Sequence, residues 1–183
     1  MPEPANPDAV RLALSRLADA QGDRLYATLS RLTLRGETAG ELLQELFLRL
    51  GRTAGFVAAD DPGAYAFRAA INLAMEWRRK RKAAAPMVSL AEAMEIESGG
   101  TSPLRRMVVL EEHERLLNAL SEMSETDQRL FVLRFIEEQS YEVIAKEIGT
   151  TPHRARGLCH AAMRRLRDRV LPGDRIAPEK NHV

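Results

Sequence analysis

The sequence predicts an all-α protein, made of two small helical domains joined by a linker, the C-terminal one a helix-turn-helix. Apolar residues recur at helical spacing along most of the chain, and no stretch alternates as a strand does. A segment with prolines and a Ser-Gly-Gly-Thr-Ser tract separates two sets of helical patterns. We therefore expect a first domain over 8–82, a linker over 83–106, a second domain over 107–171 and a tail over 172–183.

The composition is that of a chain able to bury a core. Of its 183 residues, 45% are hydrophobic and 29% are charged. Because 27 Lys and Arg face 26 Asp and Glu, the distribution of charge, rather than its sum, must indicate a partner. The single cysteine excludes an intramolecular disulfide framework and a multi-cysteine zinc site. With no signal-peptide core and no membrane-length apolar run, we expect a cytoplasmic protein without membrane insertion.

The first domain begins with residues 10–34, expected to form one or two helices interrupted near Gly22. The next helix has the sequence ELLQELFLRL. Its apolar stripe consists of Leu42, Leu43, Leu46, Phe47 and Leu50, and its opposite face of Glu41, Gln44, Glu45 and Leu48. A leucine on a charged face suggests a partner surface, although a solvated face with one exposed leucine is the common alternative.

A loop over 51–63, marked by Gly, Asp and Pro, leads into a long helix. The buried stripe expected there is Ala66, Ala69, Ala70, Leu73 and Trp77, with Tyr65, Arg68, Asn72, Glu76 and Arg79 opposite. The helix ends in five consecutive cations, residues 78–82. Cations suit a helix C-terminus, but five exceed what the helix dipole needs, so a surface facing phosphates is an equal alternative.

The second domain carries clear signals for helix ends. Leu116, Leu117 and Leu120 are the apolar positions of its first helix, and Leu130, Phe131, Leu133 and Phe135 those of its second. Ser124 and Ser140 can each cap a helix. Gly149 suits the left-handed residue that ends a helix, and Thr151 with Pro152 suits the start of the next. The tight turn between two helices predicts a helix-turn-helix.

The last helix has one apolar and one basic face. Ala155, Leu158, Cys159, Ala162 and Leu166 form the apolar face, and His153, Arg154, Gly157, His160, Ala161 and Arg164 lie away from it. A basic outer face on the second helix of such a motif suits the major groove of DNA, whereas a helical hairpin with a solvated basic face is the simpler alternative. We expect Cys159 to pack in the core, and the histidines lack partners at metal-ligand spacing.

Taken together, both halves resemble bacterial RNA polymerase sigma factors of the small extracytoplasmic-function (ECF) subfamily. ELLQELFLRL is similar to the core-binding helix D-L-V-Q-E-x-F-L-R-x, and INLAMEWRRKRK to the promoter helix N-L-A-x-D-x-x-R-R-x-R. The segment from Leu117 to Arg167 is similar to the whole C-terminal region of that family. The resemblance covers roughly residues 10–171, and the order and separation of its motifs make it specific.

The resemblance implies partners and site residues. Core RNA polymerase would be bound through the clamp helices of its largest subunit and the flap of the second largest, and promoter DNA through both domains. An anti-sigma factor is a further candidate partner; no cofactor, metal or catalytic activity is implied. The implied residues are Glu41, Gln44, Glu45, Leu48 and Arg49 for polymerase; Tyr65, Arg68, Asn72, Arg78 and Arg79 for the −10 element; and His153, Arg154, Arg156, Gly157, His160 and Arg164 for the −35 element.

The chain departs from the family pattern at several positions. Tyr65 stands where tryptophan is usual, which preserves stacking with a smaller ring, and glutamates replace the usual aspartates at 41 and 76. Met123 and Ser124 replace a common Leu-Pro pair. Glycine and leucine at 157 and 158 replace a common Ser-Arg pair, which removes one expected DNA contact.

Three other interpretations compete with this one. A stand-alone helix-turn-helix regulator would bind DNA without polymerase, but it leaves the Glu41–Arg49 face unexplained and would normally need dimer symmetry. A helical enzyme is a second, although the sequence holds no paired catalytic carboxylates, nucleophile–base motif or Gly-rich phosphate loop. A degenerate sigma-like protein that binds only polymerase or a regulator is the third, because the recognition helix diverges.

Overall fold

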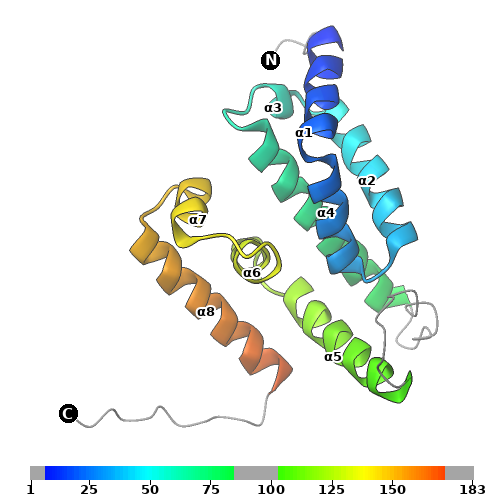
Figure 1. Cartoon of the computed structure of the whole chain (residues 1–183), viewed down its shortest axis with the longest axis vertical. Coiled ribbons are helices and arrows are strands. Elements are labelled where there is room, and N and C mark those ends of the chain that lie inside the picture. Colours follow the sequence, from blue (N-terminus) through cyan, green and yellow to red (C-terminus); the bar gives the residue numbers. More distant parts are fainter. Residues whose placement is uncertain (1–6, 85–102, 172–183) are drawn as a thin grey trace.

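Helices account for the regular structure of residues 7–84 and 103–171, which are the parts of the chain that this computed structural model describes. Helices α1 to α4 form the N-terminal domain, and α5 to α8 form the C-terminal domain (Figure 1). No strand occurs among the described residues, which confirms the predicted all-α class. Most of the predicted linker, residues 85–102, and the tail over 172–183 lie outside them.

The N-terminal domain is built on α1 (Pro7–Thr33), α2 (Gly36–Gly51) and α4 (Pro62–Ala84). These three helices pack side by side, with α3 (Ala54–Val57) at one end (Figure 1). The expected interruption near Gly22 was wrong, because α1 continues through it. A helical glycine costs only about 1 kcal/mol relative to alanine, and the buried residues Leu17, Leu25 and Leu29 hold the helix on either side.

The core side of α2 follows the sequence pattern closely. Leu42, Leu46 and Leu50 are buried, and Leu43 and Phe47 pack against the same core. The segment after α2 was expected to be a loop, but it contains the short helix α3. Phe56 in α3 is fully buried and therefore anchors this turn to the domain.

The C-terminal domain consists of α5 (Pro103–Ser121), α6 (Glu125–Phe131), the π-helical segment η2 (Val132–Ile136), α7 (Tyr141–Ile148) and α8 (Pro152–Val170). Helix α5 begins before residue 107, where the second domain was expected to start. Ser124 caps α6 by accepting a hydrogen bond from the Asp127 amide at 3.2 Å. The π-helical turn changes the register at the end of this helix, and Phe135, an expected apolar position, is 40% exposed.

The tight turn between α7 and α8 has the geometry that its sequence predicts. Gly149 adopts φ 69° and ψ 47°, the left-handed conformation, and the Thr150 amide donates to the Ala145 carbonyl at 2.8 Å. Thr151 caps α8 by accepting from the Arg154 amide at 3.3 Å. The helix-turn-helix expected in the C-terminal domain is therefore present.

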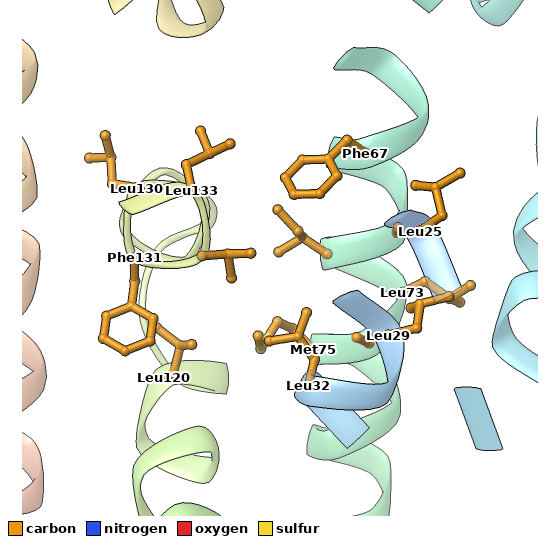
Figure 2. Close-up of a cluster of buried hydrophobic side chains, with 14 of the residues drawn as sticks. Leu25, Leu29, Leu32, Phe67, Leu73, Met75, Leu120, Leu130, Phe131 and Leu133 are labelled. Atoms are coloured by element: carbon orange, nitrogen blue, oxygen red, sulfur yellow. The ribbon is translucent and has the colours of Figure 1, made fainter. Parts of the chain in front are cut away.

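A single apolar core runs from one domain into the other. Helix α6 contacts both α4 and α8 and lies between them (Figure 1). Figure 2 shows Leu32 of α1 and Met75 of α4 on one side of this core and Leu120 of α5 and Phe131 of α6 on the other. All four are almost completely buried. The two domains therefore pack on each other and share part of their interior.

Candidate functional site

The outer face of α2 presents the residues implied for polymerase binding. Glu41, Gln44 and Arg49 are exposed, Glu45 is half-buried, and Leu48 is 56% exposed. The same helix buries Leu42, Leu46 and Leu50 on its other side, so the two faces are separated as expected.

An ion-pair chain connects this face to α4. The Arg49 guanidinium donates from Nε to Glu45 at 2.7 Å and from Nη1 to Glu76 at 3.2 Å. Lys80 donates to the other oxygen of Glu76 at 2.6 Å. The hydrogen bond from Lys80, followed by that from Arg49, lowers the pKa of Glu76, while Glu45 and then Glu76 raise the pKa of Arg49. The exposed face of α2 and the basic end of α4 therefore form one continuous charged surface.

The first part of α4 brings two of the −10 candidates together. The Arg68 guanidinium lies 5.9 Å from the centre of the Tyr65 ring, within cation–π range. The Tyr65 ring in turn lies 6.3 Å from that of buried Phe56, centre to centre, which fixes it against α3. Asn72 is half-buried, two turns further along the helix. Tyr65, Arg68 and Asn72 thus follow one another along one side of α4.

A polar pocket of about 770 Å³ lies beside Tyr65 and Arg68. The N-terminal domain lines this pocket with Asp60 and Asp61, which lie in the turn before α4. The C-terminal domain lines it with Lys146 and Glu147 of α7. Burial raises the pKa of Glu147, and nearby Arg129 opposes this shift. The start of α4 therefore faces the helix-turn-helix in this arrangement of the domains.

The other two −10 candidates lie apart from this group. Arg78 follows Tyr65 by 13 residues, which is roughly 20 Å along a helix. Its side chain is 1% exposed, and its guanidinium donates to the Leu32 carbonyl at 2.9 Å, to Glu114 at 2.5 Å and to Asn118 at 3.0 Å. Arg79 donates to the Ser121 carbonyl at 2.9 Å. In this arrangement Arg78 is not accessible to a DNA phosphate, contrary to the exposed position expected from the sequence.

The exposed face of α8 carries all the residues implied for the −35 element. Buried Ala155, Cys159 and Leu166 dock the helix on its own domain. The opposite side is exposed and carries His153, Arg154, Arg156, Gly157, His160 and Arg164. A methyl group added at Gly157 would meet no atom within 4 Å. This side of α8 is thus open to a large partner along its first three turns.

Sequence reasoning did not anticipate one structural role among the cations of α8. Arg165 forms a two-pronged ion pair with Asp127 of α6, with Nε 2.9 Å from Oδ2. Burial favours the neutral acid, but the hydrogen bonds from Arg165 and Ser124 prevail and lower the pKa of Asp127. Arg165 therefore holds α8 on α6, whereas the side chain of its neighbour Arg164 lies on the exposed side of the helix.

Sequence reasoning also missed the acidic residues that hold the two domains together. Glu114 lies on α5, and Glu137 lies just after η2. Glu137 accepts hydrogen bonds from Arg24 at 2.8 Å and from the Thr28 hydroxyl at 2.6 Å. The acidic residues near the start of the second domain are visible in the sequence. A helical pattern does not show, however, which of these charges a distant helix will contact.

Within residues 7–84 and 103–171, no group of His, Cys, Asp and Glu side chains is arranged to hold a metal ion. Cys159 is buried, and burial raises the pKa of its thiol. None of the helices over these same residues is long and apolar enough to cross a membrane.

Two protein-family models match the chain. Residues 17–84 match the model described as Sigma-70 region 2, and residues 113–166 match the model described as Sigma-70, region 4. The first match covers most of the N-terminal domain and the second most of the C-terminal domain, including the helix-turn-helix. No curated protein matches the sequence. The presence of both regions in one chain, in this order, indicates that the protein is a sigma factor of the sigma-70 family.

Proposed function

We propose that this sigma factor belongs to the ECF subfamily and directs core RNA polymerase to a set of promoters. The observation that carries the proposal is that each of its two sigma regions has implied contact residues on an exposed face, Leu48 on α2 and Arg154 on α8 above all. The region 2 domain ends at Ala84 and α5 begins at Pro103. The segment between them is too short for a further domain, which needs at least about 50 residues.

The α2 face is the proposed docking surface for the clamp helices of the largest polymerase subunit. An exposed leucine among polar residues can supply the apolar centre of such an interface, and the surrounding charges supply its rim. Glu41, Gln44 and Glu45 would then position the domain, and Leu48 would be buried on binding. Because Arg49 is held by Glu45 and Glu76 at 2.7 and 3.2 Å, its guanidinium is already oriented before the partner arrives.

The side of α4 that carries the half-buried residues Tyr65, Arg68 and Asn72 is the proposed site for the −10 element. Tyr65 offers a ring on which an unpaired base can stack, and Arg68 lies beside it to meet the backbone. Opening a base pair and flipping a base cost a few kcal/mol, which stacking and pocket contacts must offset. Asn72 can read a base edge by hydrogen bonding, while Arg79 and Lys80, which are exposed near the end of the helix, suit phosphates.

The exposed face of α8 is the proposed reader of the −35 element in the major groove. His153, Arg154 and Gly157 lie in the first two turns, where a recognition helix meets base edges. Arg164 lies further along and suits a phosphate. The same domain would contact the polymerase flap. With these partners the protein works in the cytoplasm, where polymerase transcribes.

The proposal is tested by titrating fluorescently labelled protein with purified bacterial core RNA polymerase. Gln44→Ala with Glu45→Ala should weaken binding while the thermal unfolding temperature stays close to that of the wild type, because neither side chain is buried. Ser15→Ala with Asp19→Ala is the matched control, since it removes one neutral and one acidic exposed side chain from α1.

Two results would count against the docking surface or the function itself. Equal affinities for the wild type, the α2 variant and the control would remove the α2 face from the interface. DNA binding in the absence of any binding to polymerase would favour the stand-alone helix-turn-helix regulator instead.

A further inference from the structure

Helix α4 carries one acidic residue in a strongly basic sequence. Glu76 is the single carboxylate between Pro62 and Ala84, and five consecutive cations, residues 78–82, follow it closely. Because a carboxylate repels phosphates, an acid at this position weakens the attraction of the helix for DNA unless nearby cations compensate its charge. The partners of Glu76 therefore show what an acid does at this position.

The carboxylate of Glu76 bridges Arg49 of α2 and Lys80 of α4. Its Oε2 accepts from Nη1 of Arg49 at 3.2 Å, and its Oε1 accepts from Nζ of Lys80 at 2.6 Å. Arg49 also donates from Nε to Glu45 at 2.7 Å. In both of the pairs that lie within one helix, the acid precedes the cation by one turn, which is the favoured order. The four side chains thus form one network of alternating charge.

Packed helices hold both ends of the bridge between α2 and α4. Met75, next to Glu76 in the chain, is fully buried, and Leu50, next to Arg49, is 2% exposed. The two helices pack directly on each other (Figure 1). The core therefore fixes the backbone positions from which the two side chains reach each other, as a precise binding surface requires.

The two carboxylates restrict an arginine side chain that would otherwise be free. The side chain of Arg49 is 50% exposed, and an exposed arginine samples many rotamers. Glu45 belongs to the same helix as Arg49, whereas Glu76 ties the guanidinium to a second helix. A guanidinium has more N–H groups than these two bonds use, so others remain for an acceptor on a partner.

The network matters more for binding than for folding. Its side chains are between 36% and 73% exposed, and ion pairs at such exposure add little to the stability of a fold. A side chain that is already oriented, however, loses less freedom when a partner binds it. Lys80 and then Arg49 lower the pKa of Glu76, so this carboxylate is charged at neutral pH.

We propose that Glu76 is a positioning residue for polymerase binding, although it lies on the helix assigned to DNA. Its carboxylate holds the Arg49 guanidinium in one direction, and Lys80 holds the carboxylate by its other oxygen. The guanidinium then meets an acceptor on the polymerase surface with its orientation already set. Glu76 acts through Arg49 and does not itself touch the partner. The proposal rests on the assignment of the α2 face to polymerase made above.

The test is a double-mutant cycle in the full chain with purified bacterial core RNA polymerase. Glu76→Gln removes the charge of the carboxylate and keeps the size of the side chain. Arg49→Ala removes the residue through which Glu76 acts. Fluorescence titration gives the affinity of the wild type, of both single variants and of the double variant. Asp23→Asn, which removes an exposed carboxylate of α1, is the control for the loss of charge.

We expect Glu76→Gln to weaken polymerase binding about two- to tenfold, which corresponds to the cost of ordering one flexible side chain on binding. In the Arg49→Ala background the same substitution should change the affinity less than about twofold, because the side chain that it orients is absent. Asp23→Asn should bind polymerase as the wild type does. The unfolding temperature of Glu76→Gln should stay within about 2 °C of the wild type, since the network is exposed.

Several results would overturn the proposal in distinguishable ways. If Glu76→Gln weakens binding equally with and without Arg49, Glu76 contacts polymerase itself and does not position Arg49. If Glu76→Gln binds as the wild type does, or more tightly, while Arg49→Ala binds weakly, the orientation of Arg49 does not depend on Glu76. If neither variant changes the affinity, Arg49 lies outside the interface. If the wild type does not bind polymerase, the proposed function fails and positioning fails with it.

Discussion

The same substitution, glycine to alanine, should have opposite effects on stability at two positions of the helix-turn-helix. Gly149 ends α7 with φ 69°, a conformation that alanine adopts only with strain. Gly157 lies inside α8, in helical conformation. An added methyl group meets no atom within 4 Å at either position. A difference in stability between the two variants therefore reflects their backbone conformations and not the packing of the added methyl group.

The magnitudes follow from this geometry. Left-handed backbone costs alanine about 1–2 kcal/mol, and about 0.4–1 kcal/mol of this is offset because alanine restricts the unfolded chain. Gly149→Ala should therefore destabilise the protein by about 1 kcal/mol. Gly157→Ala should stabilise it by about 0.8–1 kcal/mol, the difference in helix propensity.

Thermal unfolding of the full chain checks the contrast. For a chain of this size 1 kcal/mol corresponds to about 2–4 °C, so the two variants should differ in Tm by about 4–8 °C. Gly149→Asn should lose less than Gly149→Ala, because asparagine tolerates the left-handed region better. Equal Tm values for the two alanine variants, or a more stable Gly149→Ala, would refute the assignment of Gly149 as the helix-ending residue.

Four further outcomes are expected at other positions. Arg154→Ala should weaken binding to the −35 element by about 1–3 kcal/mol and relax specificity there, as measured on promoter variants; equal losses on all sequences would make it a phosphate contact. Leu48→Ala should weaken polymerase binding while changing the free energy of unfolding by no more than about 0.5 kcal/mol, since its side chain is exposed. Burial favours the neutral acid at Asp127, but the hydrogen bonds from Arg165 and Ser124 outweigh it and hold the pKa of this carboxyl below that of the unfolded chain. The stabilisation from the pair is therefore present above the unfolded pKa and is lost as pH falls through the folded pKa, so urea unfolding of Asp127→Asn should show a shallower loss of stability below about pH 4 than the wild type. Cys159 should react with a thiol reagent much more slowly in the native protein than in urea, because burial raises the pKa of its thiol; equal rates would contradict its burial.

Local signals explain why much of the fold was predictable. The turn between α7 and α8 depends on Gly149, Thr151 and Pro152, each of which satisfies a specific backbone requirement. The faces of α2 were predictable for a similar reason, since helical spacing alone separates Leu46 from Leu48. The predicted interruption of α1 near Gly22 was wrong, because tertiary packing of the helix outweighed the weak preference of glycine against helical conformation.

The relation between the two domains could not be predicted. Arg78 sits in a run of cations that suggests an exposed surface, yet Glu114 and the Leu32 carbonyl bury it. Whether a charge meets solvent or a distant carboxylate depends on where another helix packs, and helical periodicity contains no such information. Phe135 was misjudged for a different reason, because the π-helical turn at η2 leaves no clear mark on apolar spacing.

The central claim is that this chain gives polymerase its choice of promoter. The direct measurement is transcription in vitro by purified bacterial core RNA polymerase on genomic DNA, with and without the protein, with the 5′ ends of the transcripts mapped. The account predicts defined start sites that appear only when the protein is added and that are lost with Gln44→Ala and Glu45→Ala together. Start sites that are the same with and without the protein would contradict it.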